Sequence, residues 1–194
     1  MNDHPFGQHN AIVMAHPDDE TLWAGGLPIV FPDLNWTVIC CSIPRRDPVR
    51  AWKFHDACVM LGAMPRLLPY REQEINEVPV GLDTIDLSPF DCVVTHNQYG
   101  EYGHFHHQCV HRWVTEFSRY AGRIVTLGYR FNATGAFRVE LSPEQLQLKL
   151  AALACYDHEL PYEGEVMAKW KALRRRYYEG EHIDPQVETY DVHQ

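Results

Sequence analysis

Two short segments of the chain hold an unusual density of side chains that bind metal ions or move protons. The first follows the apolar run 11–15 and reads His16-Pro17-Asp18-Asp19-Glu20. Carboxylates crowded at the end of a strand repel one another, and a divalent cation removes that penalty. His16 and Asp19 offer the nitrogen and oxygen donors that Zn²⁺ accepts at catalytic sites, and Asp18 is placed to accept a proton from water at the metal.

These acidic residues also have a purely structural interpretation. Asp18, Asp19 and Glu20 would favour the positive end of a following helix, with Asp18 or Asp19 as the N-cap. One residue of the segment can cap the helix while its neighbour binds an ion. The segment alone therefore leaves both interpretations open.

The second segment, residues 96–107, contains four of the twelve histidines and two glycines, and it follows the apolar run 92–95. His104 and His107 are three residues apart at the start of an expected helix, so they lie on one face and can address one centre, whereas His106 points elsewhere. A third ligand from this segment would leave one coordination position for water, as in catalytic zinc sites. For any single histidine, the alternative is a solvated loop residue.

The pattern between the segments predicts the elements that must position them. Short apolar runs alternate with longer amphipathic stretches, which is typical of βαβ units with a mostly parallel sheet and helices on both faces. Strands are expected at 11–15, 36–43, 66–70, 92–95, 123–129 and 137–141, and helices at 21–31, 47–61, 104–120, 142–155 and 163–178. The 142–155 helix begins with the capping-box pattern Ser142-Pro143-Glu144-Gln145. The fold class is therefore α/β, and the absence of a GxGxxG fingerprint after the first strand argues against a dinucleotide-binding site.

Composition limits the kinds of partner. The 194 residues fit a single domain, 1–194, with a polar C-terminal tail from about 180. Seventeen basic and 26 acidic residues give a formal net charge of −9, which argues against nucleic-acid binding. No apolar run approaches the roughly 20 residues that span a membrane. Six scattered cysteines without a CxxC pair indicate reduced thiols and a cytoplasmic location.

The two segments together resemble the PIG-L/LmbE-like superfamily of zinc-dependent N-acetylglucosaminyl deacetylases. Residues 15–20 match the AHPDDE motif of that family in full. Gly103, His104 and His107 keep the outer positions of the usual GHPDH, with Phe105 and His106 in its inner positions. Weaker similarity covers Arg50 with the Leu61-Gly62 pair downstream, and the stretch 142–156.

The resemblance implies a Rossmann-like α/β fold, in agreement with the periodicity, and a role for each of these residues. His16, Asp19 and His107 would bind one Zn²⁺ per chain, with Fe²⁺ as the alternative ion. Asp18 would be the general base. His104, in protonated form, would be a second proton-transfer or electrostatic group. Tyr102 would help to stabilise the oxyanion, and Arg50 would contact the substrate.

The activity implied is removal of an N-acetyl group from an N-acetylglucosamine-type amino sugar, or its conjugate, by attack of zinc-bound water. Two alternatives remain: an amidase acting on another N-acyl or thiol-conjugate substrate, and a non-catalytic binding module that contains a metal. The partner expected is a small-molecule amino sugar, and assembly into a homo-oligomer is compatible with the sequence.

Overall fold

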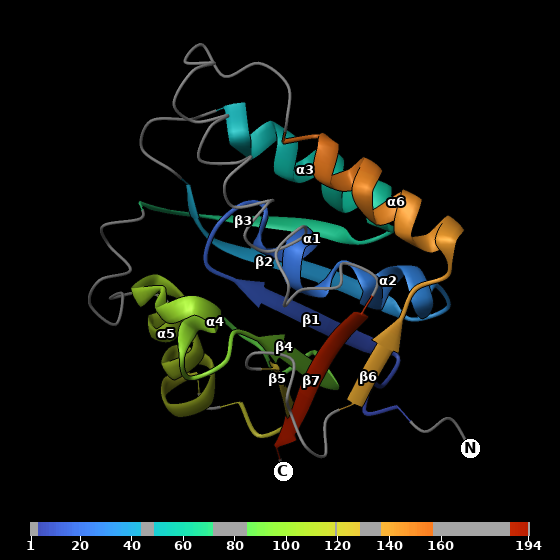
Figure 1. The fold of residues 1–194 in the computed structure, drawn as a ribbon. Coiled ribbons are helices and arrows are strands. Elements are labelled where there is room, and N and C mark those ends of the chain that lie inside the picture. The colour runs from blue at the N-terminus through green and yellow to red at the C-terminus, as the bar shows by residue number, and fades with distance from the viewer. Residues whose placement is uncertain are drawn as a thin grey trace.

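A seven-stranded sheet forms the centre of the protein. The computed structural model describes residues 4–43, 49–71, 85–118, 120–128, 137–156 and 187–193. The strands are β1 (His9–Met14), β2 (Asn35–Ile43), β3 (Met64–Arg71), β4 (Cys92–Thr95), β5 (Arg123–Leu127), β6 (Phe137–Glu140) and β7 (Val187–His193). Their order is β3-β2-β1-β4-β5-β7-β6, with the first five parallel and β7 antiparallel to both of its neighbours (Figure 1).

Both faces of the sheet are covered by helices, as the sequence predicts. The helices are α1 (Asp19–Ala24), α2 (Gly26–Val30), α3 (Val49–Leu61), α4 (Gly100–Gly103), α5 (Phe105–Arg112), the π-helix Trp113–Phe117 and α6 (Pro143–Ala154). Alternate side chains of β1 separate into two cores, because successive strand residues point to opposite faces. Ile12 and Met14 pack in the core that contains Leu27 of α2 and Phe54 of α3. Their neighbours on β1 pack in a second core with Val110 of α5.

The order of strands reverses at β1, and this reversal brings the two histidine-containing segments together. The chain passes outward from β1 to β2 and β3, and then returns to place β4 on the other side of β1. Val13 of β1 pairs with Thr95 of β4, so these parallel strands end side by side. Ligand sites of open α/β sheets form at such switch points, beyond the carboxyl ends of the strands.

Several predicted elements differ from the observed ones. The helix expected at 21–31 is two short helices that meet at Gly25 and Gly26. The helix expected at 104–120 is divided into α5 and the π-helix, and the short helix α4 precedes it. The helix expected at 163–178 lies outside the described residues. Residues 187–193 were expected in a polar tail but form β7, because Glu188 and Tyr190 alternate with more exposed residues and are buried.

The capping box at the start of α6 is confirmed. The Ser142 hydroxyl accepts a hydrogen bond from the backbone N–H of Gln145, and the Ser142 backbone N–H donates to Gln145 Oε1. Within the described residues, no helix combines the length and the apolar character that crossing a membrane requires.

A buried ion pair connects β7 to α6 on one face of the sheet. Lys149 Nζ of α6 lies 2.5 Å from Glu188 Oε1, and both side chains are nearly fully buried. The same carboxylate accepts the backbone N–H of Gly26 at 2.8 Å and the hydroxyl of Tyr190. A Cβ at position 26 would lie only 2.6 Å from Glu188 Oε2, so glycine permits this approach.

Loss of the lysine should destabilise the fold. Lys149→Met leaves the Glu188 carboxylate buried without its counter-charge, which should lower the free energy of unfolding by about 3–5 kcal/mol in urea denaturation. The double variant Lys149→Met/Glu188→Gln should recover at least half of that loss. The control is Arg112→Met, which removes an exposed ion pair with Glu116 and should cost less than about 1 kcal/mol. An unchanged urea midpoint for Lys149→Met would contradict this role.

Candidate active site

The chain turns sharply after β1, and the turn has an unusual backbone conformation. Asp18 is the N-cap of α1 and has φ 112°, a left-handed conformation that costs about 1–3 kcal/mol for a non-glycine residue. Its backbone N–H donates to Glu20 Oε2 at 3.0 Å, and its carbonyl accepts the N–H groups of Thr21 and Leu22. The turn folds Asp19 back toward His16, whose backbone N–H donates to Asp19 Oδ2 at 2.9 Å.

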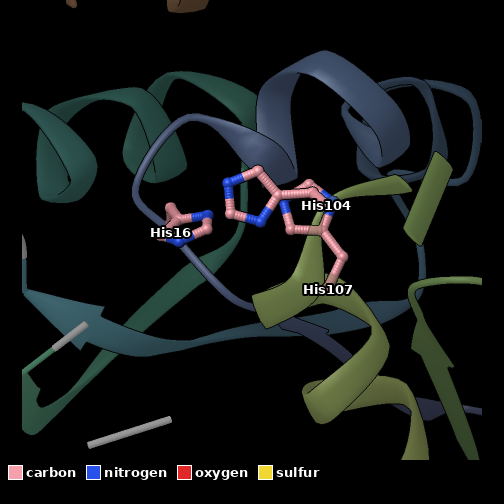
Figure 2. A group of neighbouring side chains, drawn as sticks. All are labelled: His16, His104 and His107. Carbon is pink, nitrogen blue, oxygen red and sulfur yellow. The ribbon is translucent and has the colours of Figure 1, made fainter. Parts of the chain in front are cut away.

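His16, Asp19 and His107 meet at the edge of the sheet. Asp19 Oδ2 lies 3.2 Å from His16 Nδ1 and 3.3 Å from His107 Nε2. The centres of the two imidazole rings are 5.3 Å apart, and all three side chains are buried. Figure 2 shows His16 beside His104 and His107, which come from the distant second segment. The structure thus brings the two sequence segments into one cluster.

The donor types suit a divalent cation, and two of the three separations among them match its geometry. A tetrahedral zinc ion with bonds of about 2.0–2.1 Å holds neighbouring ligand atoms about 3.3 Å apart. The measured separations from Asp19 Oδ2, 3.2 and 3.3 Å, match that spacing. Two imidazoles and one carboxylate are also the ligands of several catalytic zinc sites, in which the fourth position takes water or substrate.

Among the described residues, two groups of three side chains bring potential ligand atoms within 4.8 Å of one another, and they share His107. One group is His16, His104 and His107, the other is Asp19, His96 and His107, and neither is the full set His16, Asp19 and His107 expected from the sequence. His96 is the least suitable member, because Nε2 accepts the backbone N–H of Ala15 at 2.9 Å and Nδ1 lies 2.9 Å from Glu101 Oε2. A cation could use His96 only by breaking one of these contacts.

His104 lies against the rings of the other two histidines. Its half-buried ring stacks on His107 with centres 4.4 Å apart and meets the edge of His16 at 4.8 Å. Burial, together with the neighbouring His107 and His16, lowers the pKa of His104 to about 3. The imidazole is therefore neutral near pH 7, which favours a role in hydrogen bonding over the protonated form expected from the sequence.

Asp18 and Arg50 form an ion pair at the same edge of the sheet. The guanidinium of Arg50, near the start of α3, contacts Asp18 Oδ2. Burial raises the pKa of Asp18 more than the charge of Arg50 lowers it, so the carboxylate is a stronger base than usual. Arg50 was expected to contact the substrate, and that role stays a prediction.

Glu20 connects the turn to the end of α6. Its carboxylate is fully buried and accepts the hydroxyl of Tyr156 at 2.6 Å and that of Thr21 at 2.7 Å. Burial raises the pKa of Glu20 to about 7. Tyr156 was not singled out from the sequence, because a tyrosine at the end of an amphipathic helix carries no signal of such a contact.

Three other residues beside the cluster were missed or misplaced. Glu101 Oε2 contacts Nδ1 of both His96 and His107, and Glu101 Oε1 accepts the backbone N–H of Asn97 at 3.0 Å. His106 was expected to point away, but its Nδ1 lies 3.1 Å from His16 Nε2. That expectation assumed a regular helix from His104, whereas His104 is an extended N-cap.

Tyr102 belongs to α4, but its side chain lies outside the described part of the structure. Its predicted role at the oxyanion therefore stays a prediction. For His96 one sequence signal existed: it directly follows β4, as His16 follows the end of β1. For Glu101 there was none.

Comparisons with known proteins identify the fold. No family model and no curated protein matches the sequence. Among solved structures, N,N'-diacetylchitobiose deacetylase from Pyrococcus horikoshii superposes with a TM-score of 0.66 and 14% identity, over 96% of this chain and 84% of that one. A deacetylase of teicoplanin biosynthesis has a TM-score of 0.63 and 15% identity, over 96% and 99%.

The same architecture also carries a different chemistry. The 4-carboxy-2-hydroxymuconate hydratase of Pseudomonas putida has a TM-score of 0.57 and 14% identity, over 95% of each chain. The fold is thus shared at low identity by enzymes of at least two kinds. Over nearly its whole length, this chain has the mixed α/β fold of the LmbE/PIG-L deacetylases that its two motifs resemble.

Proposed function

We propose that this protein is a metal-dependent hydrolase that removes the N-acetyl group from an N-acetylglucosamine-type amino sugar or its conjugate. One observation carries the proposal: Asp19 Oδ2 lies within 3.3 Å of nitrogen atoms of both His16 and His107, directly beside the buried carboxylate of Asp18. The names of the structural neighbours, which include a chitobiose deacetylase and a teicoplanin deacetylase, support an acetylated amine as the substrate.

His16, Asp19 and His107 would hold the ion, one Zn²⁺ per chain, with Fe²⁺ as the alternative. A divalent cation in such a site acidifies water and polarises an amide carbonyl. The buried carboxylates favour binding, because an unneutralised cluster of acids would be costly in this environment. The neutral ring of His104 stacks on His107 and lies beside the position that the ion would take.

Asp18 would move the protons of the reaction. Its carboxylate accepts a proton from the attacking water as the oxygen bonds to the acetyl carbon, and the same proton can pass to the amine nitrogen when the C–N bond breaks. The products are acetate and a free amine. Arg50 holds the Asp18 carboxylate in place through the ion pair, while the N–H of His104 and the hydroxyl of Tyr102 would stabilise the carbonyl oxygen.

The fold alone does not choose this reaction, since a hydratase shares it. Release of acetate and a primary amine separates hydrolysis of an acetamide from hydration. Incubation with N-acetylglucosamine, N,N'-diacetylchitobiose and an N-acetylcysteine conjugate, with amine release followed by fluorescamine, separates an amino-sugar deacetylase from an amidase for thiol conjugates. A protein that binds zinc and releases no amine from any acylated compound would be the non-catalytic module.

Location and assembly also remain predictions. Four of the six cysteines are buried, and the cytoplasmic location expected from the cysteine pattern stays a prediction. A homo-oligomer is equally untested.

The metal content of variants should identify the ligands. The purified wild-type protein should hold about one equivalent of zinc, as measured by atomic emission. His107→Ala and Asp19→Ala should each lose most of this zinc. His104→Ala is the matched control, because it removes a neighbouring imidazole of the same cluster and should keep its zinc. Zinc lost from His104→Ala and kept by Asp19→Ala would instead make His16, His104 and His107 the ligand set.

The general base can be separated from the ligands. Asp18→Asn should keep about one zinc while its kcat falls at least 10²-fold, since the amide cannot accept the proton of water. Asparagine tolerates positive φ better than most residues, so the turn should be preserved. Near-wild-type kcat in this variant would assign the base to another residue.

A further inference from the structure

The carboxylate of Glu101 is surrounded by hydrogen-bond donors. The backbone N–H of Asn97 donates to Oε1 at 3.0 Å. On the other side, Oε2 contacts Nδ1 of His96 at 2.9 Å and Nδ1 of His107. A single oxygen atom of Glu101, Oε2, therefore contacts the Nδ1 atoms of both rings.

The proton positions follow from one backbone group. The N–H of Ala15 can only donate, so Nε2 of His96, 2.9 Å away, accepts and carries no proton. Because Nε2 carries no proton, the ring is neutral and its proton lies on Nδ1, which is directed to Glu101. His96 thus links the end of β1 to Glu101 in a defined tautomer.

The same carboxylate determines which ring nitrogen of His107 carries a proton. Oε1 of Glu101 already accepts the N–H of Asn97 and Oε2 accepts the Nδ1–H of His96, so both oxygens of the carboxylate act as acceptors. An ionised carboxylate only accepts hydrogen bonds, so Nδ1 of His107 must carry a proton. Nε2 of His107 then faces Asp19 Oδ2, 3.3 Å away, where the ion would bind.

We propose that Glu101 is a positioning residue that holds the proton on Nδ1 of His107, so that Nε2 is the nitrogen presented to a cation. Through its contact with His96, Glu101 also connects the His107 ring to the end of β1. Carboxylates that hold the second nitrogen of a ligating histidine orient the ring and strengthen metal binding. The inference rests on the proposed function only in requiring a cation at His107; the identity of the substrate does not enter.

The backbone at position 101 supports a functional reason for glutamate. Glu101 has φ 55°, and its neighbour Gly100, at φ 66°, is the kind of residue that this conformation favours. Glycine at position 101 would relieve the backbone strain and remove the carboxylate. The fold therefore does not need glutamate there for its local conformation.

The first variant is Glu101→Gln. All three groups that face the carboxylate are donors, so the amide NH₂ must oppose one of them wherever it lies. The dissociation constant for Zn²⁺, measured by competition with a chromophoric chelator, should rise about 10- to 100-fold. Glu116→Gln, an exposed glutamate on the following π-helix, is the matched control and should leave the constant unchanged.

The second variant, Glu101→Gly, separates metal binding from folding. The melting temperature of the metal-free variant should lie within a few degrees of that of the metal-free wild type. Its affinity for Zn²⁺ should nevertheless be lower than that of the wild type. Side-chain ¹⁵N NMR of the wild-type protein adds a measurement that needs no variant. Loaded with Zn²⁺, it should show protons on Nδ1 of both His96 and His107, and none on Nε2 of His107.

A zinc dissociation constant of Glu101→Gln within twofold of the wild type, or a zinc-loaded His107 without a proton on Nδ1, would overturn the inference. These measurements do not depend on catalysis. A protein that shows the expected zinc affinity and proton positions but cleaves no acetylated amine would overturn the proposed function alone.

Discussion

The carboxylate of Asp19 is the point on which the rest of the site depends. Its Oδ2 atom lies within 3.6 Å of nitrogen atoms from His16, His96 and His107, which come from two segments far apart in the chain. Burial alone would make this carboxylate hard to ionise, yet the surrounding imidazoles hold its pKa well below the usual range. A buried cluster of this kind is stable only with positive charge in or around it, from a protonated histidine or from a cation.

The strand order explains how the two segments reach this point. β1 and β4 are neighbours and parallel, so the residues that follow Val13 and Thr95 leave the sheet together. The turn at Asp18 and the bend at Gly100 then direct side chains back over the ends of these strands. Outside this region, the contacts of Lys149 with Glu188 and of Tyr156 with Glu20 hold α6 against β7 and against the turn.

Sequence patterns predicted the periodic parts of this structure. Continuous apolar runs marked β1, β2 and β4, and the pattern from Ser142 marked the start of α6. Periodicity failed where the backbone leaves regular geometry, as at the N-cap His104 or at Glu101 with its positive φ. Periodicity also failed for β7, whose alternating polar residues resemble a solvated tail. The sequence alone does not show that Lys149 of α6 neutralises the buried Glu188. Candidate ligands were readable from residue type, but the contacts that orient them depend on tertiary structure.

The location of the ion itself decides whether Asp19 and the two histidines form the metal site. Crystals of the zinc-loaded protein, with anomalous diffraction measured at the zinc absorption edge, would place the metal independently of any assumed ligand. We expect one peak per chain, about 2.0–2.1 Å from a nitrogen of His16, an oxygen of Asp19 and Nε2 of His107. A peak coordinated by His96 or His104 in place of Asp19, or no peak near these residues, would contradict this assignment of the ligands.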